Sequence, residues 1–160
     1  MLKKESIRIR STGKVDVEFI LSAVDFIRTY ADHCHHGKEE NILFRDLKKK
    51  ELSAPHAQVL KDLEEEHVKG RQVVFDLVAA RQQYLKGDKI AINEIARLMD
   101  VLVQFYPKHI EKEDKHFFIP CMAYFTKQEQ DAMLTECFEF DRQMIYKKYE
   151  QAVRQLEQES

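Results

Sequence analysis

The residues of this sequence that could do chemistry are histidines and glutamates at helical spacing. Seven histidines are present. Two of them begin an i, i+4 pair with a carboxylate: His35 with Glu39, and His109 with Glu113. In a helix such partners share one face, about 6 Å apart along the axis. An imidazole and a carboxylate placed in this way can bind one metal ion or two neighbouring ions, as in bundles whose ligands project inward from facing helices.

A further histidine supports the metal interpretation. His67 and His109 interrupt helix faces that otherwise carry leucine, valine, isoleucine and phenylalanine. Burying an imidazole or a carboxylate in an apolar core costs free energy unless the group is paired or metal-bound. One inward histidine is more often a hydrogen-bonded core residue, and one His–Glu pair is commonly a surface ion pair. Three helices that each bring such a group inward favour a metal site.

Four helical segments must position these residues. Apolar residues at three- and four-residue steps indicate helices whose approximate ranges are 14–44, 53–87, 89–117 and 126–156. Ser53 and Pro55 are typical of a helix start, and Thr126 with Glu129 forms a capping box. Pro107 is expected to bend the third helix. Short connections predict antiparallel neighbours, so the fold class is an all-α, antiparallel, up-and-down four-helix bundle.

The domain organisation follows from the same pattern. The bundle is expected to occupy residues 15–160, and residues 1–14 form a polar N-terminal arm with a short extended piece at Ile7 to Arg10. The C-terminal helix is expected to close the bundle, and its core candidates are Phe138, Phe140, Met144 and Tyr149. A chain of 160 residues can bury one core of this kind.

Composition excludes several other classes. The net charge is −2 with both signs interleaved, which argues against a nucleic-acid partner. The apolar runs are too short for a membrane span, and Met1 to Glu5 does not lead into a signal peptide. Cys34, Cys121 and Cys137 form no CxxC motif, which favours a reducing, cytoplasmic location over a disulfide framework.

Three stretches of the chain resemble the motifs of hemerythrin-like (HHE cation-binding) proteins. The stretch from His35 to Phe44, HHGKEENILF, is similar to the signature HHxKEExxLF. The stretch from Glu66 to Arg71, EHVKGR, resembles EHxxGR, and HIEKED from His109 to Asp114 resembles HIxKED. The motifs occur in the family's order, and the similarity covers about residues 15 to 125.

The resemblance implies two non-haem iron ions, joined by an oxo or hydroxo bridge, inside a helical bundle. By position, it makes His35, His67 and His109 terminal ligands, with Glu39 and Glu113 as bridges. Some family members bridge through a carboxylate five residues after the histidine, which here is Asp114, and this alternative stays open. His36, paired with Glu40 at i+4, is about 100° round the helix and is interpreted as an outer or solvated residue.

The histidines outside these motifs receive weaker assignments. His56 is three turns from His67, too far to share a site. His33 and His116 are expected at the surface or behind the ligands.

The chain departs from the family in one respect. Members usually carry an earlier helix with another ligand histidine, and none of the residues before Lys14 is a histidine. The C-terminal helix offers Tyr146, Glu136 and Glu139 as replacements, which the sequence does not rank. The incomplete ligand set argues against reversible oxygen carriage.

The resemblance and the residues favour a protein that binds or senses O2 or a related small ligand such as NO at a di-iron site. A di-iron enzyme that turns over O2, peroxide or NO is the second hypothesis. A structural metal-binding interaction bundle is the third. A binding protein is favoured over an enzyme, and a homodimer that covers an exposed apolar stripe is a further expectation.

Overall fold

The computed structural model describes residues 1–158, with the side chains of 151–153 and 155–158 left out of the description. Within this part of the chain every element is helical and no strand occurs. No helix of the described residues is long and apolar enough to cross a membrane. The elements are α1 (Leu2–Thr12), α2 (Val17–Phe26), η1 (Ile27–His36), η2 (Glu39–Phe44), α3 (Arg45–Leu47), α4 (Ala54–Leu85), α5 (Ala91–His116), α6 (Phe118–Cys121), η3 (Met122–Tyr124) and α7 (Lys127–Gln158).

The elements α2, η1, η2 and α3 form one continuous helix with widened turns over residues 17–47, which is called the long helix below. Asp16 caps its start by accepting a hydrogen bond from the Phe19 N–H at 2.9 Å. Its central parts, η1 and η2, are π-helical, so the Gly37 N–H donates to the Asp32 carbonyl five residues earlier. Turns of this kind are rare and are frequent at functional sites. Here they coincide with the stretch that contains His35 and Glu39.

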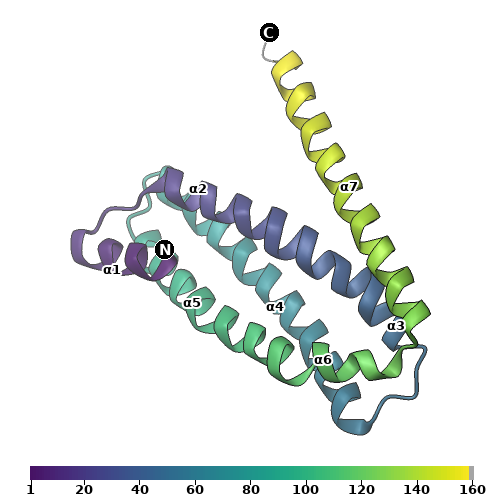
Figure 1. Ribbon diagram of the computed structural model, residues 1–160. Helices are drawn as coiled ribbons and strands as arrows, with labels where there is room; N and C mark the ends of the chain where they lie inside the picture. The colour runs from purple at the N-terminus through teal and green to yellow at the C-terminus, as the bar shows by residue number, and fades with distance from the viewer. Residues whose placement is uncertain (159–160) are drawn as a thin grey trace.

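The long helix, α4 and α5 pack together as a helical bundle (Figure 1). Gly70 allows α4 and α5 to approach closely, because a Cβ there would lie 3.2 Å from the Phe105 ring. Buried apolar residues form two clusters. One includes Leu77 and Met99, and the other includes Phe44 and Leu63. Residues of the predicted metal site lie between the two along all three helices. The all-helical class is confirmed, while the four-helix topology stays a prediction.

The N-terminal residues form a helix that was not expected. The prediction of an extended piece at Ile7 to Arg10 is wrong, because α1 covers this stretch. The helix packs on α5, where Ile9 is buried and Ser6 donates a hydrogen bond to Asp100 at 2.5 Å. The residues in contact are about ninety positions apart in the chain, so local sequence patterns do not reveal these contacts. The boundary of the bundle domain at residue 15 stays a prediction.

The C-terminal helix α7 runs antiparallel along the outer side of η2 and η1, and its far end diverges from the bundle (Figure 1). Arg45 pairs with Glu136 at 2.6 Å, and Lys38 pairs with Asp141 at 2.8 Å. Gly37 lies at this crossing, where an added Cβ would be 2.8 Å from the Phe140 ring and would force that ring to shift.

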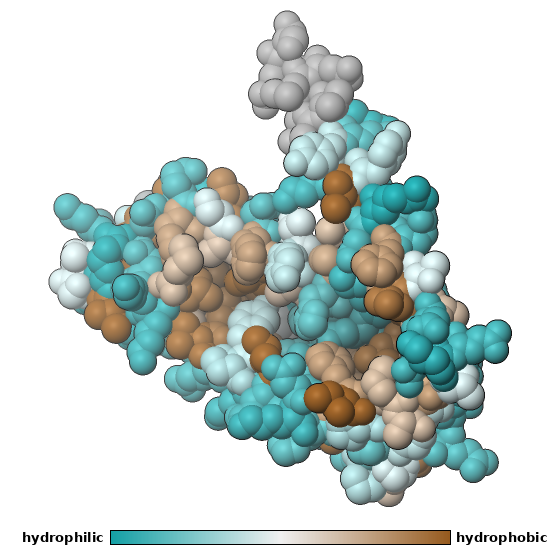
Figure 2. All heavy atoms as spheres, in the orientation of Figure 1, coloured by the Kyte–Doolittle hydropathy of each residue, from teal (hydrophilic) through white to brown (hydrophobic). Residues whose placement is uncertain are grey.

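The expected core of α7 is only partly present. Phe140 is half-buried and packs on the cluster around Phe44, and Met144 is also half-buried. Phe138 and Tyr149 are 66% and 70% exposed, so their assignment to the core is wrong. Figure 2 shows apolar side chains that reach the surface over α2 and α7, among mostly polar neighbours. The apolar face of α7 is therefore only half covered by its own chain.

Candidate metal centre

Six side chains form two adjacent groups that could each hold a metal ion. The first, called the buried position, comprises His36, His67 and His109. The second, called the open position, comprises His35, Glu39 and Glu113. Within each group, the potential ligand atoms lie within 4.8 Å of one another. The six residues come from the long helix, α4 and α5, so the packing of the bundle creates both positions.

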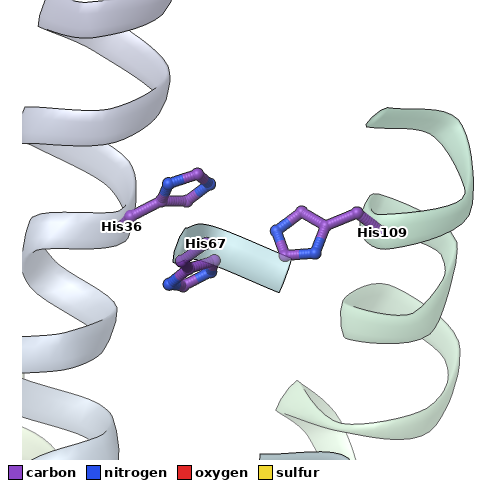
Figure 3. A group of neighbouring side chains, drawn as sticks. All are labelled: His36, His67 and His109. Carbon is purple, nitrogen blue, oxygen red and sulfur yellow. The ribbon is translucent and has the colours of Figure 1, made fainter. Parts of the chain in front are cut away.

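The buried position consists of imidazoles from three helices (Figure 3). His67 is fully buried, and the two other rings are at most 3% exposed. His36 stacks on His67 with ring centroids 3.9 Å apart, and His109 meets His67 edge-on at 5.1 Å. Figure 3 shows His36 and His109 reaching toward each other from facing helices, with His67 below the space between them.

Two carboxylates lie between the buried and the open position. The Glu39 Oε1 atom is 3.3 Å from His35 Nε2, and its Oε2 atom is 3.4 Å from His67 Nε2. The Glu113 Oε2 atom is 3.8 Å from His35 Nε2, and its Oε1 atom is 2.9 Å from His109 Nε2. Each carboxylate thus directs one oxygen toward each position, which is the arrangement that a bridging ligand needs.

Several ligand atoms of the cluster have no hydrogen-bond partner. Among the described residues, His36 Nδ1, His67 Nε2, His109 Nε2, Glu113 Oε1 and both Glu39 oxygens are buried without a hydrogen-bond partner. His109 Nε2 and Glu113 Oε1 lie 2.9 Å apart, but neither can donate to the other while His109 carries its proton on Nδ1, beside Glu66. Each such atom costs about 1–3 kcal/mol of desolvation free energy when nothing compensates it. A cation among the imidazole nitrogens and carboxylate oxygens would satisfy them together. The residues present therefore fit a metal centre.

The opposite ring nitrogens of two histidines are held by carboxylates. His67 Nδ1 lies 2.7 Å from Glu40 Oε1, and His109 Nδ1 lies 2.9 Å from Glu66 Oε2. A carboxylate accepts a hydrogen bond, so Nδ1 carries the proton and Nε2 keeps its lone pair for a metal. These contacts fix both the tautomer and the direction of the two rings.

Cations support the carboxylates in turn. Arg71 donates to Asp32 at 2.7 Å and to Glu40 at 2.8 Å, and Lys112 donates to Glu66 at 2.6 Å. Asp32 Oδ1 also lies 3.4 Å from His36 Nδ1. Every histidine of the buried position therefore has an acidic residue beside its Nδ1 atom, and each acid is bound by a cation. No such contact is present at His35 Nδ1 in the described part of the chain.

Burial and neighbouring charges shift the pKa values of the cluster's acidic and imidazole groups in different directions. Burial, reinforced by the neighbouring Glu113 carboxylate, raises the pKa of Glu39 to about 9. Burial would also raise the pKa of Glu113, but the imidazoles of His109 and His35 outweigh it and hold this pKa well below its usual range. Burial and the adjacent imidazoles lower the pKa of His36 to about 4. His36 is thus neutral at pH 7, the form that binds metals.

The structure brings together all five residues that the sequence predicted: His35, Glu39, His67, His109 and Glu113. Their role as metal ligands stays a prediction. Between the two carboxylates left open on α5, Glu113 is buried in the cluster and Asp114 is exposed.

The remaining candidates lie elsewhere. His56 binds the Tyr124 hydroxyl at 2.8 Å, away from the cluster. On α7, Glu136 pairs with Arg45, Glu139 pairs with Arg142, and Tyr146 is 72% exposed. None of these three α7 residues belongs to either group of potential ligands. His33 and His116 are exposed, as expected for surface residues.

Of the two alternatives given for His36, an outer or a solvated residue, the structure contradicts the second. The side chain is buried against His67 and His109. The expected angle of about 100° between neighbouring residues holds for an α-helix. A π-helical turn contains more residues, so consecutive side chains are separated by a smaller angle, and His35 and His36 both face inward. The adjacent pair of histidines was the only sequence signal for this arrangement.

A helical bundle around a cluster of imidazoles and carboxylates defines a class of metal-binding proteins. The family model described as the hemerythrin HHE cation binding domain matches residues 6–121. The chain belongs to this family, and the match spans all six residues of the cluster. No curated protein and no solved structure matches the chain.

Proposed function

We propose that the protein binds two non-haem iron ions, one at each position of the cluster. His36, His67 and His109 would hold the ion of the buried position, and His35 would hold the ion of the open position. Glu39 and Glu113 would bridge the two ions. The observation that carries this proposal is the set of unpaired nitrogen and oxygen atoms that face one another in a buried space.

The chemistry of the donors supports iron. The cluster combines imidazoles with carboxylates, and no cysteine belongs to it. Sites rich in thiolates select zinc, copper(I) or iron–sulfur clusters, whereas imidazole and carboxylate donors suit non-haem iron as well as zinc. The nearest cysteine in sequence, Cys34, donates to Asp141 of α7 at 3.4 Å instead.

The open position is where a small ligand such as O2 or NO would bind. Bound iron supplies reducing electrons and a free coordination position for such a ligand. The His35 side chain is 46% exposed, while the Glu39 and Glu113 side chains beside it are at most 6% exposed. Phe118 meets the His35 ring edge-on at 6.5 Å. Solvent therefore reaches the open position at His35, while its two carboxylates are buried.

Elemental analysis with an optical spectrum tests the metal assignment. The full chain, purified after expression with ample iron, should contain close to two iron ions per chain and absorb in the near-ultraviolet when oxidised. Addition of NO to the reduced protein without air should change the spectrum in proportion to the iron content. Zinc alone, or no stoichiometric metal, would contradict the proposal.

The half-exposed His35 also supports a second candidate, a di-iron enzyme that turns over O2 or peroxide. One histidine at the open position leaves more room for water or substrate than a closed site has. Fast oxidation in air and steady consumption of peroxide in stopped-flow measurements would favour the enzyme. A spectrum that recovers repeatedly when oxygen is removed would favour a reversible binding protein.

A further inference from the structure

A surface groove of about 430 Å³ lies along the seam between η1 and α4 and borders the metal cluster at His36. Its walls are mainly apolar and include Ile27, Val68, Val74 and Phe75. Tyr106 of α5 also lines it. The volume is within the range of small-molecule sites, and Arg28, Asp32, Arg71 and Gln72 supply the polar groups of the lining.

The two ends of the groove differ in chemistry. The helices η1 and α4 run antiparallel, since Asp32 contacts Arg71 and His36 stacks on His67. Arg28 therefore lies level with Phe75 at one end, and His36 lies level with Val68 at the other. The seven residue steps from Val68 to Phe75 span roughly 10 Å along α4. Both of these side chains are more than 60% exposed, so an apolar occupant would cover surface that the chain leaves in water.

Arg28 is the charged group of this groove that has no partner. The guanidinium of Arg71 is already occupied by Asp32 and Glu40. Arg28 also lines the groove, and among the described residues it makes no ion pair. A free guanidinium beside an apolar wall favours a ligand that carries a carboxylate at one end and a hydrocarbon tail at the other.

We propose that this groove binds a small amphipathic carboxylic acid, with its carboxylate on Arg28 and its tail along Val68 and Phe75. The tail would end near His36, so an occupied groove would lie directly against the buried position of the metal cluster. The site is separate from the open position, and the proposal stands on the groove and Arg28 whether or not the cluster holds iron.

Calorimetric titration of the purified full chain tests the proposal. Octanoate is the probe, octanol lacks its charge, and acetate lacks its tail. Octanoate should bind saturably and more tightly than either control. Arg28→Gln should weaken octanoate binding about tenfold, as expected for the loss of one charge-assisted contact. Arg97→Gln is the matched control, because Arg97 is an exposed arginine of α5 that pairs with Glu94.

The controls separate this groove from other binding modes. Equal affinity for octanol would show that the charge is irrelevant, and equal affinity for acetate would indicate coordination to a metal ion. Either result, an unchanged affinity in Arg28→Gln or the absence of saturable binding would overturn the proposal. Phe75→Ser should also weaken octanoate binding. Because Phe75 is 61% exposed, this change leaves the core intact.

Discussion

The two positions of the metal cluster share their carboxylates but differ in everything that surrounds them. The buried position has three imidazoles, each at most 3% exposed, and His67 and His109 each donate an Nδ1 proton to a carboxylate. The open position has His35 alone, half-exposed and without such a partner in the described residues. Supported ligands are held in one orientation and bind metal more tightly. We therefore expect the buried position to hold its proposed ion more tightly than the open position.

The largest effect is expected from removing the shared centre of the cluster. His67→Ala should abolish stoichiometric metal binding, because His67 Nε2 lies close to both Glu39 and Glu113 and the ring is fully buried. Elemental analysis of the purified variant measures this loss. His56→Ala, on the same helix but outside the cluster, should retain the metal. Equal metal content in the two variants would mean that the site is misplaced.

Two neighbouring histidines provide a sharper test of the difference between the positions. His35→Ala should leave about one tightly bound ion per chain, since the buried position keeps all three imidazoles. His36→Ala should weaken binding at the buried position and therefore reduce the content of both ions. Metal content after dialysis against a chelator distinguishes the two. The same residual content in both variants would show that the positions are equivalent.

The acids behind the imidazoles should contribute a smaller but measurable part. Glu66→Gln removes the charge that orients His109 and should lower metal affinity by about 10- to 100-fold. The neighbouring Glu65 is 68% exposed and contacts only Lys61 among the described residues, so Glu65→Gln is the matched control. Competition with a chromogenic chelator gives both affinities. An unchanged affinity in Glu66→Gln would show that His109 needs no such support.

The smallest effect concerns the pH dependence of stability without metal. The pKa of Glu39 is raised from 4.5 to about 9, so the folded chain retains a proton that the unfolded chain has lost. Stability of the metal-free protein should therefore fall as the pH rises from 7 to 9. Glu39→Gln imitates the protonated acid and should reduce this fall, by about 2–4 °C in Tm for each kcal/mol involved. Thermal unfolding of both proteins at pH 7 and pH 9 measures this difference. An equal fall in Tm in the wild type and in Glu39→Gln would contradict the raised pKa of Glu39.

The sequence predicted those features that depend on local spacing. The helices around His67 and His109 and the pairing of Glu113 with His109 follow from the period of an α-helix. His35 and Glu39 were also paired correctly, although they lie in widened turns. His36 could not be placed, because its orientation depends on widened turns that the pattern of apolar residues does not show. The helix α1 was missed because Ser6 and Ile9 are buried by a distant segment.

The C-terminal helix was misjudged for a related reason. Its apolar residues occur at helical spacing, but spacing does not say how many neighbours a helix has. Phe140 packs against the long helix at Gly37, whereas Phe138 is 66% exposed. Long-range packing decided both outcomes.

The widened turns of η1 also determine how this helix tolerates changes in chain length. In a π-helical turn the hydrogen bonds join residues five apart instead of four, so the turn contains one more residue than an α-helical turn. Deleting a single residue between Ile27 and Asp32 would let this part of the helix return to the α pattern without losing a turn, so that neighbouring side chains would be about 100° apart. His35 and His36 could then no longer both face the bundle. His36 is therefore a ligand candidate because the widened turns orient its side chain inward, and not only because it is a histidine.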